Sequence, residues 1–448
     1  MQPVKTRAGG APAVRRSPSP ARRGIAAVGI GNAIEWYDFA IYGSFATVLG
    51  VTFFPGLDAA TQLLLAFAVY GTALLVRPLG ALVFGRLGDT RGRRPVLAVV
   101  IVLMSVATAA VGLLPGYLAI GIAAPILLLL FRVCQGLGAG GELGVSSVFL
   151  FEHAPHRHRG AVGSFQVATL SLGMAAGMAV AAALSTVGGG TAVQAGWWRL
   201  AFLTALPLGM IGWYVRTRVN ETGEFLALRD SVIRQRPWRR LFADSRSRLW
   251  RGFVIMGVGS LAYNTFFVFL PNHHIVHSGG SSSLTWFVSA SALVVTAVAA
   301  VTLGHLSDRI GRRPVVAGSA LGLLLLAVPM SVTAGGSLLQ LWIAQCLIGL
   351  CIGGVLSVAM LAEAFPAEHR STAVAMTAGL GTALIGGTAP AVDQLLVTVS
   401  GVAIAPGIYL AVVAGAALLA ASSWDRGSTS RRSRRTEQSP VTGQLASS

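Results

Sequence analysis

The sequence predicts an all-α integral membrane protein with twelve transmembrane helices in two pseudo-symmetric six-helix bundles. Three observations lead to this prediction. The 448 residues are 54% hydrophobic and only 11% charged. Apolar runs recur between Gly24 and Ser423, each about 18 residues or longer and therefore able to cross a hydrocarbon core of roughly 30 Å. Short basic motifs also recur at equivalent places in the two halves of the chain.

The apolar runs are predicted to be helices, because backbone amides in lipid must form hydrogen bonds within their own segment. The first bundle (25–217) contains predicted spans at 25–51, 60–84, 95–115, 121–150, 161–187 and 197–217. The second bundle (251–423) contains predicted spans at 251–271, 283–303, 314–335, 338–362, 371–398 and 402–423. A polar, arginine-rich inter-domain segment, 218–250, separates the two bundles.

The ends of the chain are polar and basic. Residues 1–24 combine basic side chains with Pro, Ser, Ala and Gly, a composition that predicts a disordered arm. Residues 424–448 form a second polar tail with several arginines.

The distribution of Lys and Arg predicts which side of the membrane each connection faces. Basic clusters occur in both terminal segments, in the central segment and in the connections after the second, fourth, eighth and tenth spans. No Lys or Arg occurs in the alternate connections, which are 52–59, 116–120, 188–196, 272–282, 336–337 and 399–401. We therefore predict a multi-pass protein of the plasma or inner membrane, with both termini cytoplasmic. Because the net charge of +18 is spread over these clusters, we expect no nucleic-acid partner.

No pattern in the sequence predicts an enzyme, a metal site or a nucleotide-driven pump. The three cysteines lie in predicted spans without zinc-like spacing. His273, His274 and His277 lie in the predicted 272–282 connection without an acidic or cysteine ligand near them, so an exposed polar loop is expected there. The Gly-x-Gly patterns follow no strand, and the sequence contains no Walker motif. We therefore expect neither a cofactor nor a metal.

Two motifs are repeated in the two halves. GRLGDTRGRRPV begins at Gly85 and GHLSDRIGRRPV begins at Gly304, each after the second span of its own half. EHAPHRHR begins at Glu152 and EAFPAEHR at Glu363, each after the fourth span. Two parallel repeats are typical of transporters in which one half rocks against the other around a central site.

We predict that the repeated motifs form a cytoplasmic gate. The arginines after each motif's aspartate can pair with Glu152 or Glu363, or bind the carbonyl ends of neighbouring helices. The simpler alternative is that these arginines only anchor the loops on the cytoplasmic side. The predicted gate residues are Gly85, Asp89, Gly92, Arg93, Arg94, Glu152, Arg159, Gly304, Asp308, Gly311, Arg312, Arg313, Glu363 and Arg370.

The doubled G-x-L-x-D-x-x-G-R-R-P motif resembles the signature of the major facilitator superfamily. GNAIEWYDFAIYG, at 31–43, is similar to the first span of its metabolite:proton symporter family, which includes proline/betaine, α-ketoglutarate, citrate and shikimate transporters. The resemblance extends from Gly24 to Trp424 and implies the major facilitator fold and transport driven by the proton gradient.

Some positions of the predicted span 371–398 depart from the family pattern. Ala378 and Gly379 stand where relatives often carry an aromatic–Asn pair, and Ser371 stands where they often carry Tyr. Asp393 is also unexpected. In the family this span lines the cavity, so the departures bear on the substrate rather than on the fold.

The first predicted span carries two acidic residues that are candidates for proton coupling. Glu35 lies about ten residues into the span, roughly 15 Å deep at 1.5 Å per residue. Asn32, Glu35, Asp38 and Tyr42 share one broad helical face. Two carboxylates three residues apart can share a proton. The alternative is a fixed ion pair with an arginine of another helix, and the sequence does not decide between Glu35 and Asp38 as the proton carrier.

The fourth predicted span adds further candidates. RVCQG, at 132–136, resembles the superfamily's motif in this span, which implies that Arg132 takes part in proton coupling as a partner of Asp89, of a first-span carboxylate or of the substrate. Glu142 is either a site residue or a partner of Arg77. The predicted substrate-binding residues are Asn32, Tyr42, Arg77, Arg132, Gln135, Glu142, Tyr263 and Asn264.

Glycines also repeat every four residues in this span. Gly136, Gly140 and Gly144 form a strip of small residues that predicts close approach of two helix backbones.

Together these observations predict proton-coupled symport, by alternating access, of a small organic acid or zwitterion such as a dicarboxylate, citrate, proline or betaine. One chain is expected to suffice. The alternative is a proton-antiport exporter of drugs or metabolites on the same fold, which the direction of proton-driven flux distinguishes. A membrane sensor without transport activity would lack buried charges, and this sequence has them. The sequence does not identify the substrate.

Overall fold

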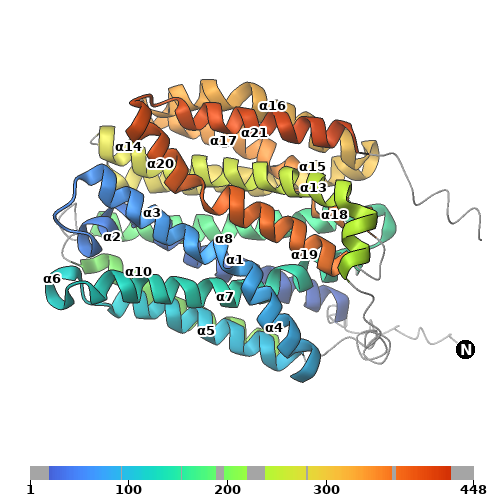
Figure 1. Ribbon diagram of the computed structural model, residues 1–448, viewed down its shortest axis with the longest axis horizontal. Helices are drawn as coiled ribbons and strands as arrows, with labels where there is room; N and C mark the ends of the chain where they lie inside the picture. The colour runs from blue at the N-terminus through green and yellow to red at the C-terminus, as the bar shows by residue number, and fades with distance from the viewer. Residues whose placement is uncertain are drawn as a thin grey trace, which may run out of the picture.

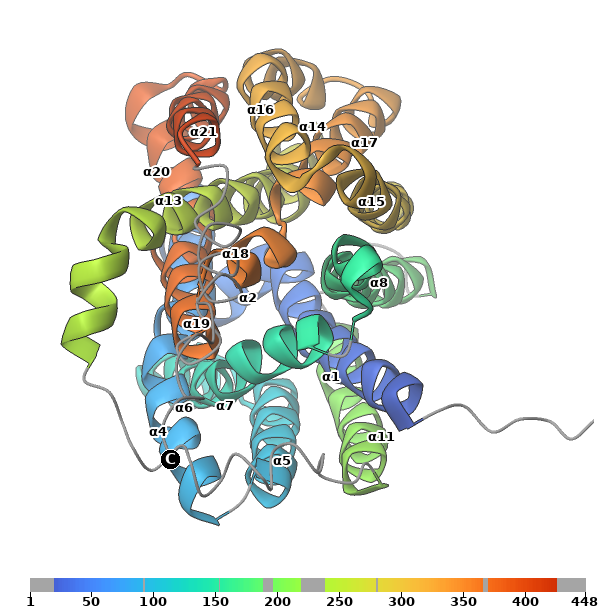
Figure 2. The same cartoon turned by 90° about the vertical axis from the view of Figure 1, so that its right-hand side faces the viewer.

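A computed structural model describes residues 20–91, 93–152, 154–187, 196–218, 238–278, 281–365 and 370–424 of the chain. Its long helices run roughly parallel to one another along the longest axis of the molecule (Figure 1). Viewed along that axis, helices α14–α17, α20 and α21 of the second half lie above helices α4, α5, α7 and α11 of the first half (Figure 2).

The helices of the first half are α1 (Pro20–Ser44), α2 (Ala46–Phe53), α3 (Ala59–Leu75), α4 (Arg77–Arg91), α5 (Arg93–Leu113), α6 (Tyr117–Ile120), α7 (Ala123–Glu152), η1 (His156–His158), α8 (Arg159–Val187), α10 (Trp198–Leu203) and α11 (Ala205–Arg218). Those of the second half are α13 (Trp238–Asn264), η3 (Thr265–Phe269), α14 (Leu270–Ser278), α15 (Ser282–Ile310), α16 (Arg312–Ala334), α17 (Leu338–Val355), α18 (Val358–Ala364), α19 (Arg370–Gly381), η4 (Thr382–Gly387), α20 (Ala389–Ser400) and α21 (Ala405–Ser422). Segments η3 and η4 are π-helical turns within longer helices.

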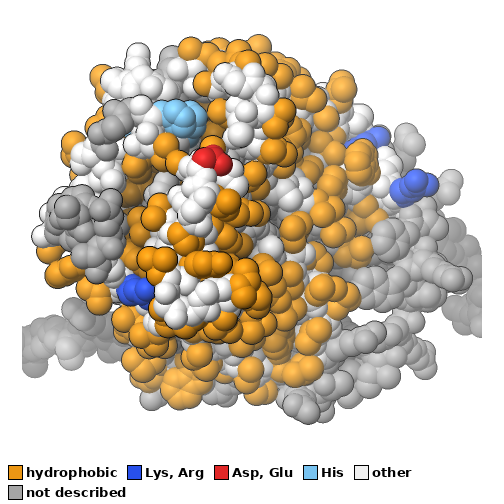
Figure 3. All heavy atoms as spheres, turned by 60° about the vertical axis from the view of Figure 1, so that its left-hand side comes forward, with side chains coloured by type: hydrophobic (Ala, Val, Ile, Leu, Met, Phe, Trp, Pro, Cys, Tyr) orange, Lys and Arg blue, Asp and Glu red, His pale blue; other side chains and the backbone are white. Residues whose placement is uncertain are grey.

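Each of the twelve predicted spans is occupied by helix, as the all-α class requires. Among the described residues, nine helical stretches are long and apolar enough to cross a membrane. Hydrophobic side chains are spread over much of the described surface shown in Figure 3, where few charged side chains are visible. Val298, Val412 and Leu419 are 59%, 67% and 73% exposed. An apolar surface of this extent is expected to face lipid rather than water.

Two helices extend beyond their predicted spans. Helix α13 begins at Trp238, inside the segment predicted to be a polar connection, and continues without a break into the apolar span. Helix α14 extends the same span to Ser278, so His273, His274 and His277 are helical and His274 is buried. Hydropathy marks where an apolar run ends, whereas a helix continues until its backbone hydrogen bonding is interrupted.

The predicted glycine strip brings helix backbones together. A Cβ atom added to Gly136 would overlap the carbonyl oxygen of Ala73, and one added to Gly140 would overlap that of Arg77. Helix α7 can therefore pack directly against α3 and α4, as predicted. The surroundings of Gly144 lie outside the described part of the chain.

Helix α3 begins at an exposed N-cap. Asp58 accepts hydrogen bonds from the backbone N–H groups of Ala60 and Thr61, at 3.1 and 3.0 Å. The Thr61 hydroxyl group and these N–H groups hold the pKa of Asp58 below its usual value.

Candidate functional site

A cavity of about 60 Å³ lies where the two halves meet. At roughly 10–15 Å³ for each water molecule, it has room for a few waters. The first half lines it with Asn32, Trp36, Arg77, Gln166, Val167 and Leu170. The second half lines it with Met256, Ser260, Tyr263, Asn264, Leu356, Val358, Ala378 and Thr382. Arg77 is the one charged residue that lines the cavity in the described part of the chain.

Arg77 forms a buried ion pair with Glu35. The Nη2 atom of Arg77, at the start of α4, lies 2.6 Å from Oε1 of Glu35 in α1. Both side chains are almost completely buried. The guanidinium group also lies over the rings of Trp36 and Phe39, 5.1 and 4.7 Å from their centroids. The predicted alternative, an ion pair between a first-span acid and an arginine of another helix, is present for Glu35.

Asp38 occupies a different environment from Glu35. Its Oδ2 atom accepts a hydrogen bond from the hydroxyl group of Thr108 in α5, at 2.9 Å. Among the residues that the structure describes, Oδ1 has no hydrogen-bond partner and the carboxylate forms no ion pair. The two acids three residues apart therefore point to different partners, so they are not a pair bridged by one proton in this structure.

Arg132 is linked to Asp38 through two side chains. Its Nη1 atom donates to Oε1 of Gln135 at 2.8 Å, and Nε2 of Gln135 donates to the Thr108 hydroxyl at 2.5 Å. Its Nη2 atom donates to the backbone oxygen of Tyr70 at 3.1 Å. Among the described residues Arg132 forms no direct bond to a first-span carboxylate, because Gln135 and Thr108 link it to Asp38. Its other predicted partners, Asp89 and the substrate, stay predictions.

Aromatic rings enclose the guanidinium group of Arg132. Its central carbon lies 4.2 Å from the ring centroid of Tyr42, 4.9 Å from that of Phe39 and 5.4 Å from that of Tyr70. This arrangement replaces some of the lost hydration with cation–π contacts. Tyr42, Arg132 and Gln135, which were predicted to bind substrate, do not line the cavity.

Three other predicted residues do line the cavity and connect helices. Asn32 donates to the backbone oxygen of Gln166 and to the hydroxyl group of Thr169 in α8, at 2.8 and 2.9 Å. Asn264 accepts a hydrogen bond from the Tyr70 hydroxyl at 2.9 Å, across the two halves. Tyr263 donates to Ser171 at 3.4 Å, also across the halves.

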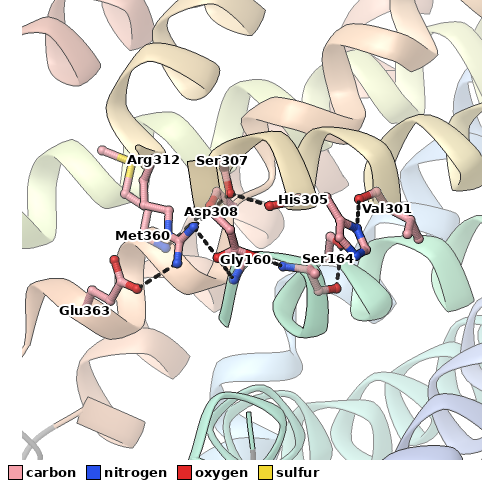
Figure 4. A network of polar contacts seen from close by, with 12 residues as sticks. Gly160, Ser164, Val301, His305, Ser307, Asp308, Arg312, Met360 and Glu363 are labelled. Carbon is pink, nitrogen blue, oxygen red and sulfur yellow. Dashed lines mark hydrogen bonds and ion pairs between the residues drawn. The ribbon is translucent and has the colours of Figure 1, made fainter. Parts of the chain in front are cut away.

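The second-half gate motif contacts the first half directly (Figure 4). Asp308, near the end of α15, accepts hydrogen bonds from the backbone N–H groups of Gly160 and Ala161 at 2.8 and 2.9 Å. These are N–H groups of the first turn of α8, which favours a negative charge. Arg312 binds Asp308 at 2.6 Å and Glu363 at 3.2 Å. The predicted contact between the motif arginine and Glu363 is thus present.

The other second-half gate residues shape the same region. Gly311 joins α15 to α16 with φ of 98°, a conformation that favours glycine. A Cβ added to Gly304 would meet Ser164 of α8. Arg370 donates to the backbone oxygen of Ala362 at 2.8 Å, and Arg313 donates to that of Ser422.

Most of the first-half gate cannot be compared with its prediction. Gly85 lies in α4 and Arg159 begins α8. Residue 92 and the side chains of Asp89, Arg93, Arg94, Glu142 and Glu152 lie outside the described part of the chain.

Several site residues were missed by sequence reasoning. Thr108, Tyr70 and Trp36 complete the buried network or line the cavity, and none stands out by its type alone. Gln166 was a polar residue in an apolar span, a signal that could have identified it.

Comparisons with known proteins agree with this architecture. Residues 25–237 match the family described as "Sugar (and other) transporter", and residues 253–446 match the "Major Facilitator Superfamily". The proline/betaine transporter of Salmonella typhimurium LT2 is 34% identical over 410 residues, which cover 88% of this chain and 81% of the relative. The chain belongs to the major facilitator superfamily. Its relatives are consistent with the metabolite:proton symporter family indicated by the first-span motif.

A second relative in this superfamily has a different named substrate. The citrate-proton symporter of Klebsiella pneumoniae is 32% identical over 400 residues, which cover 87% of this chain and 88% of the relative. Among solved structures, a D-xylose-proton symporter has a TM-score of 0.72 at 18% identity, covering 90% of this chain and 97% of that chain. The structural likeness shows the major facilitator fold. Membership of the superfamily and the apolar helices of the described residues make this chain a multi-pass membrane protein.

Proposed function

We propose that the chain is a proton-coupled symporter that takes up a small zwitterion with one carboxylate group by alternating access. The observation that carries the proposal is the buried Arg77–Glu35 ion pair, whose arginine lines the cavity between the halves. This ion pair narrows the predicted range of substrates, which included dicarboxylates and citrate, to zwitterions such as proline or betaine.

The charge balance of the cavity supports a zwitterion. Arg77 is already neutralised by Glu35, and the second half lines the cavity with uncharged residues in the described part of the chain. A dicarboxylate or tricarboxylate would bring two or three negative charges to a single paired cation. Uncompensated charge inside a membrane protein costs several kcal/mol. A zwitterion brings its own balancing charge.

Both charged ends of a zwitterion would have partners. Its carboxylate can bind Arg77, and its cationic group can bind the faces of Trp36 and Tyr263, which line the cavity with their ring centroids 6.3 Å apart. The names of the proline/betaine relatives agree with this substrate class. Because the cavity holds only a few waters in this arrangement, substrate binding requires the halves to separate.

Asp38 is the better candidate for the proton carrier. Glu35 has a cationic partner at 2.6 Å, which favours its charged form, whereas Asp38 has a single hydrogen bond from Thr108. Proton binding at Asp38 would remove a negative charge from the network that contains Arg132. Because Arg132 also holds the backbone of Tyr70, this change would bear on the Tyr70–Asn264 contact between the halves.

We further propose that the chain crosses the cell membrane twelve times with both termini cytoplasmic, works as a single chain and needs no cofactor or metal. The alternation of basic and non-basic connections supports this orientation.

Uptake into liposomes reconstituted with the full chain tests the proposal. An inward proton gradient should drive accumulation of labelled proline or glycine betaine, a protonophore should abolish it, and excess citrate should not compete. Liposomes without protein and the Arg77→Ala variant are the controls. Proton-driven efflux of these compounds, or competition by citrate as strong as by the unlabelled zwitterion, would contradict it.

A further inference from the structure

A second buried acid lies in the other half of the molecule. Asp393 is in α20, and its residue is 0% exposed. Its Oδ2 atom accepts a hydrogen bond from the hydroxyl group of Thr265 at 2.7 Å. Within the described residues, its Oδ1 atom has no hydrogen-bond partner. Neither the repeated motifs nor the cavity accounts for this residue.

The helices around Asp393 provide no counter-ion. Helix α20 packs against α3, α13, η3, η4 and α21. The sequences of α3, η3, η4 and α21 contain no Lys, Arg or His. The arginines of α13 end at Arg251, about 21 Å along the helix from Thr265 at 1.5 Å per residue. Asp393 forms no ion pair in the part of the chain that the structure describes.

Few other titratable groups lie on these helices. Tyr409 of α21 interacts electrostatically with Asp393. Tyr70 of α3 and Tyr263 of α13 are engaged with Asn264 and Ser171. The histidines of α14 follow η3 in the same span. None of these groups is in hydrogen-bonding contact with Asp393 among the described residues.

An ionised carboxylate in this position is physically unfavourable. Burying a charge without a partner costs several kcal/mol, and intramembrane acids normally face a partner, a cavity or an ion pathway. A proton on Asp393 removes that cost. The environment repeats that of Asp38 in the first half, where a threonine hydroxyl binds one carboxylate oxygen and the other has no partner in the described structure.

The surroundings of Asp393 are built from adjustable helix segments. Thr265 is the first residue of the π-helical turn η3, and the π-helical turn η4 ends shortly before α20. Such turns occur often at functional sites, because they interrupt the regular hydrogen bonding of a helix. A movement of either span would change the Thr265–Asp393 contact.

We propose that Asp393 is a second proton-binding site, located in the C-terminal half, which takes up and releases a proton during the transport cycle. This inference rests on the proposed proton-coupled function and adds a proton to its stoichiometry. Asp38 is then the proton-binding residue of the first half, and Asp393 is that of the second half.

Infrared difference spectroscopy of the purified full chain tests proton binding without any substrate. Two carbonyl bands of buried protonated carboxyl groups should disappear as the pH is raised, one lost in Asp38→Asn and the other in Asp393→Asn. Thr265→Val should shift the Asp393 band without removing it, because the hydrogen bond is lost while the acid remains. This variant keeps the test valid if Asp393→Asn does not fold. A spectrum of Asp393→Asn identical to that of the unaltered protein would overturn the proposal.

The proton-to-substrate ratio tests whether this proton is transported. Reversal-potential measurements in liposomes with labelled proline or betaine should give a ratio lower by one in Asp393→Asn. A ratio that Asp393→Asn leaves unchanged, or a requirement for Na⁺ that this variant removes, would overturn the proposal. If the bands titrate as expected but no zwitterion is transported, the proposed function fails and the proton site stands.

Discussion

The hydroxyl group of Tyr70 in α3 donates a 2.9 Å hydrogen bond to Oδ1 of Asn264 in α13, which joins the two halves beside the cavity. Tyr70 is also bound through its backbone oxygen to Arg132. Hydrogen bonds therefore continue from Asp38 through Thr108, Gln135 and Arg132 to the contact between the halves. This continuity offers a physical route by which a proton can influence opening.

Tyr70→Phe should weaken the contact between the halves. A hydrogen bond contributes about 1 kcal/mol, so its loss should raise the population of open states about fivefold. The rate at which a thiol reagent labels Ala378→Cys, in a background without the native cysteines, measures this opening. Tyr37→Phe is the matched control, because Tyr37 binds Thr204 within the first half. Equal labelling rates in Tyr70→Phe and the parent would contradict the prediction.

Asp38→Asn should uncouple transport from the proton. Because asparagine resembles a permanently protonated aspartate, we expect exchange of labelled for unlabelled substrate to continue while proton-driven accumulation falls at least about tenfold. Uptake at several external pH values measures the effect, and its increase at acidic pH should disappear. Asp58→Asn, which changes an exposed cap of α3, should behave like the unaltered protein. A retained pH dependence in Asp38→Asn would contradict the assignment.

Variants of Arg77 and Glu35 should show whether this ion pair only stabilises the fold or is also needed for transport. Removing one member of a buried ion pair typically costs about 3–5 kcal/mol, because the other charge is left unpaired. Arg77→Met and Glu35→Gln should each lower the thermal unfolding midpoint, and the double variant should recover much of the loss. Substrate uptake should remain absent in the double variant. Restored uptake together with restored stability would mean that the pair is only structural.

Asp308→Ala should loosen the contact of α15 with α8. It removes the acceptor of two backbone N–H groups and the partner of Arg312. We expect faster cleavage or labelling of reporter sites beside Gly160, by about fivefold if one hydrogen bond is lost and about thirtyfold if two are lost, at about 1 kcal/mol each. Ser331→Ala, which removes a hydroxyl bound only within α16, is the control. No change in accessibility would favour the alternative that the motif only anchors the loop.

Gly140→Ala should destabilise the first half. The added methyl group would overlap the backbone of α4 at Arg77 and Ala81, and overpacking typically costs about 1–3 kcal/mol. Thermal unfolding of the purified protein measures the loss. Gly318→Ala is the matched control in α16, since no atom lies within 4 Å of its added Cβ. Equal stability of the two variants would show that α7 and α4 can separate without cost.

The limits of sequence-based prediction differ between the fold and the site. Apolar runs predicted the helical segments of the described chain, because the cost of unbonded backbone in lipid is a local property of each segment. The start of α13 and the end of α14 were missed, because the helix continues beyond the apolar stretch at both points. Of the residues predicted to bind substrate, Asn32, Arg77, Tyr263 and Asn264 line the cavity, whereas Arg132, Gln135 and Tyr42 do not, and their role in binding stays a prediction.

The sequence by itself therefore determined the all-helical class, the repeated motifs and which acids lie within apolar segments. Only the tertiary structure decided that Glu35 pairs with Arg77, that Asp38 binds Thr108, and that Tyr70 meets Asn264 across the halves. The physical reason is the range of each interaction. Hydropathy and helical period act within one segment, but the partner of a buried polar group depends on which helices pack together and on the rotation of each about its axis.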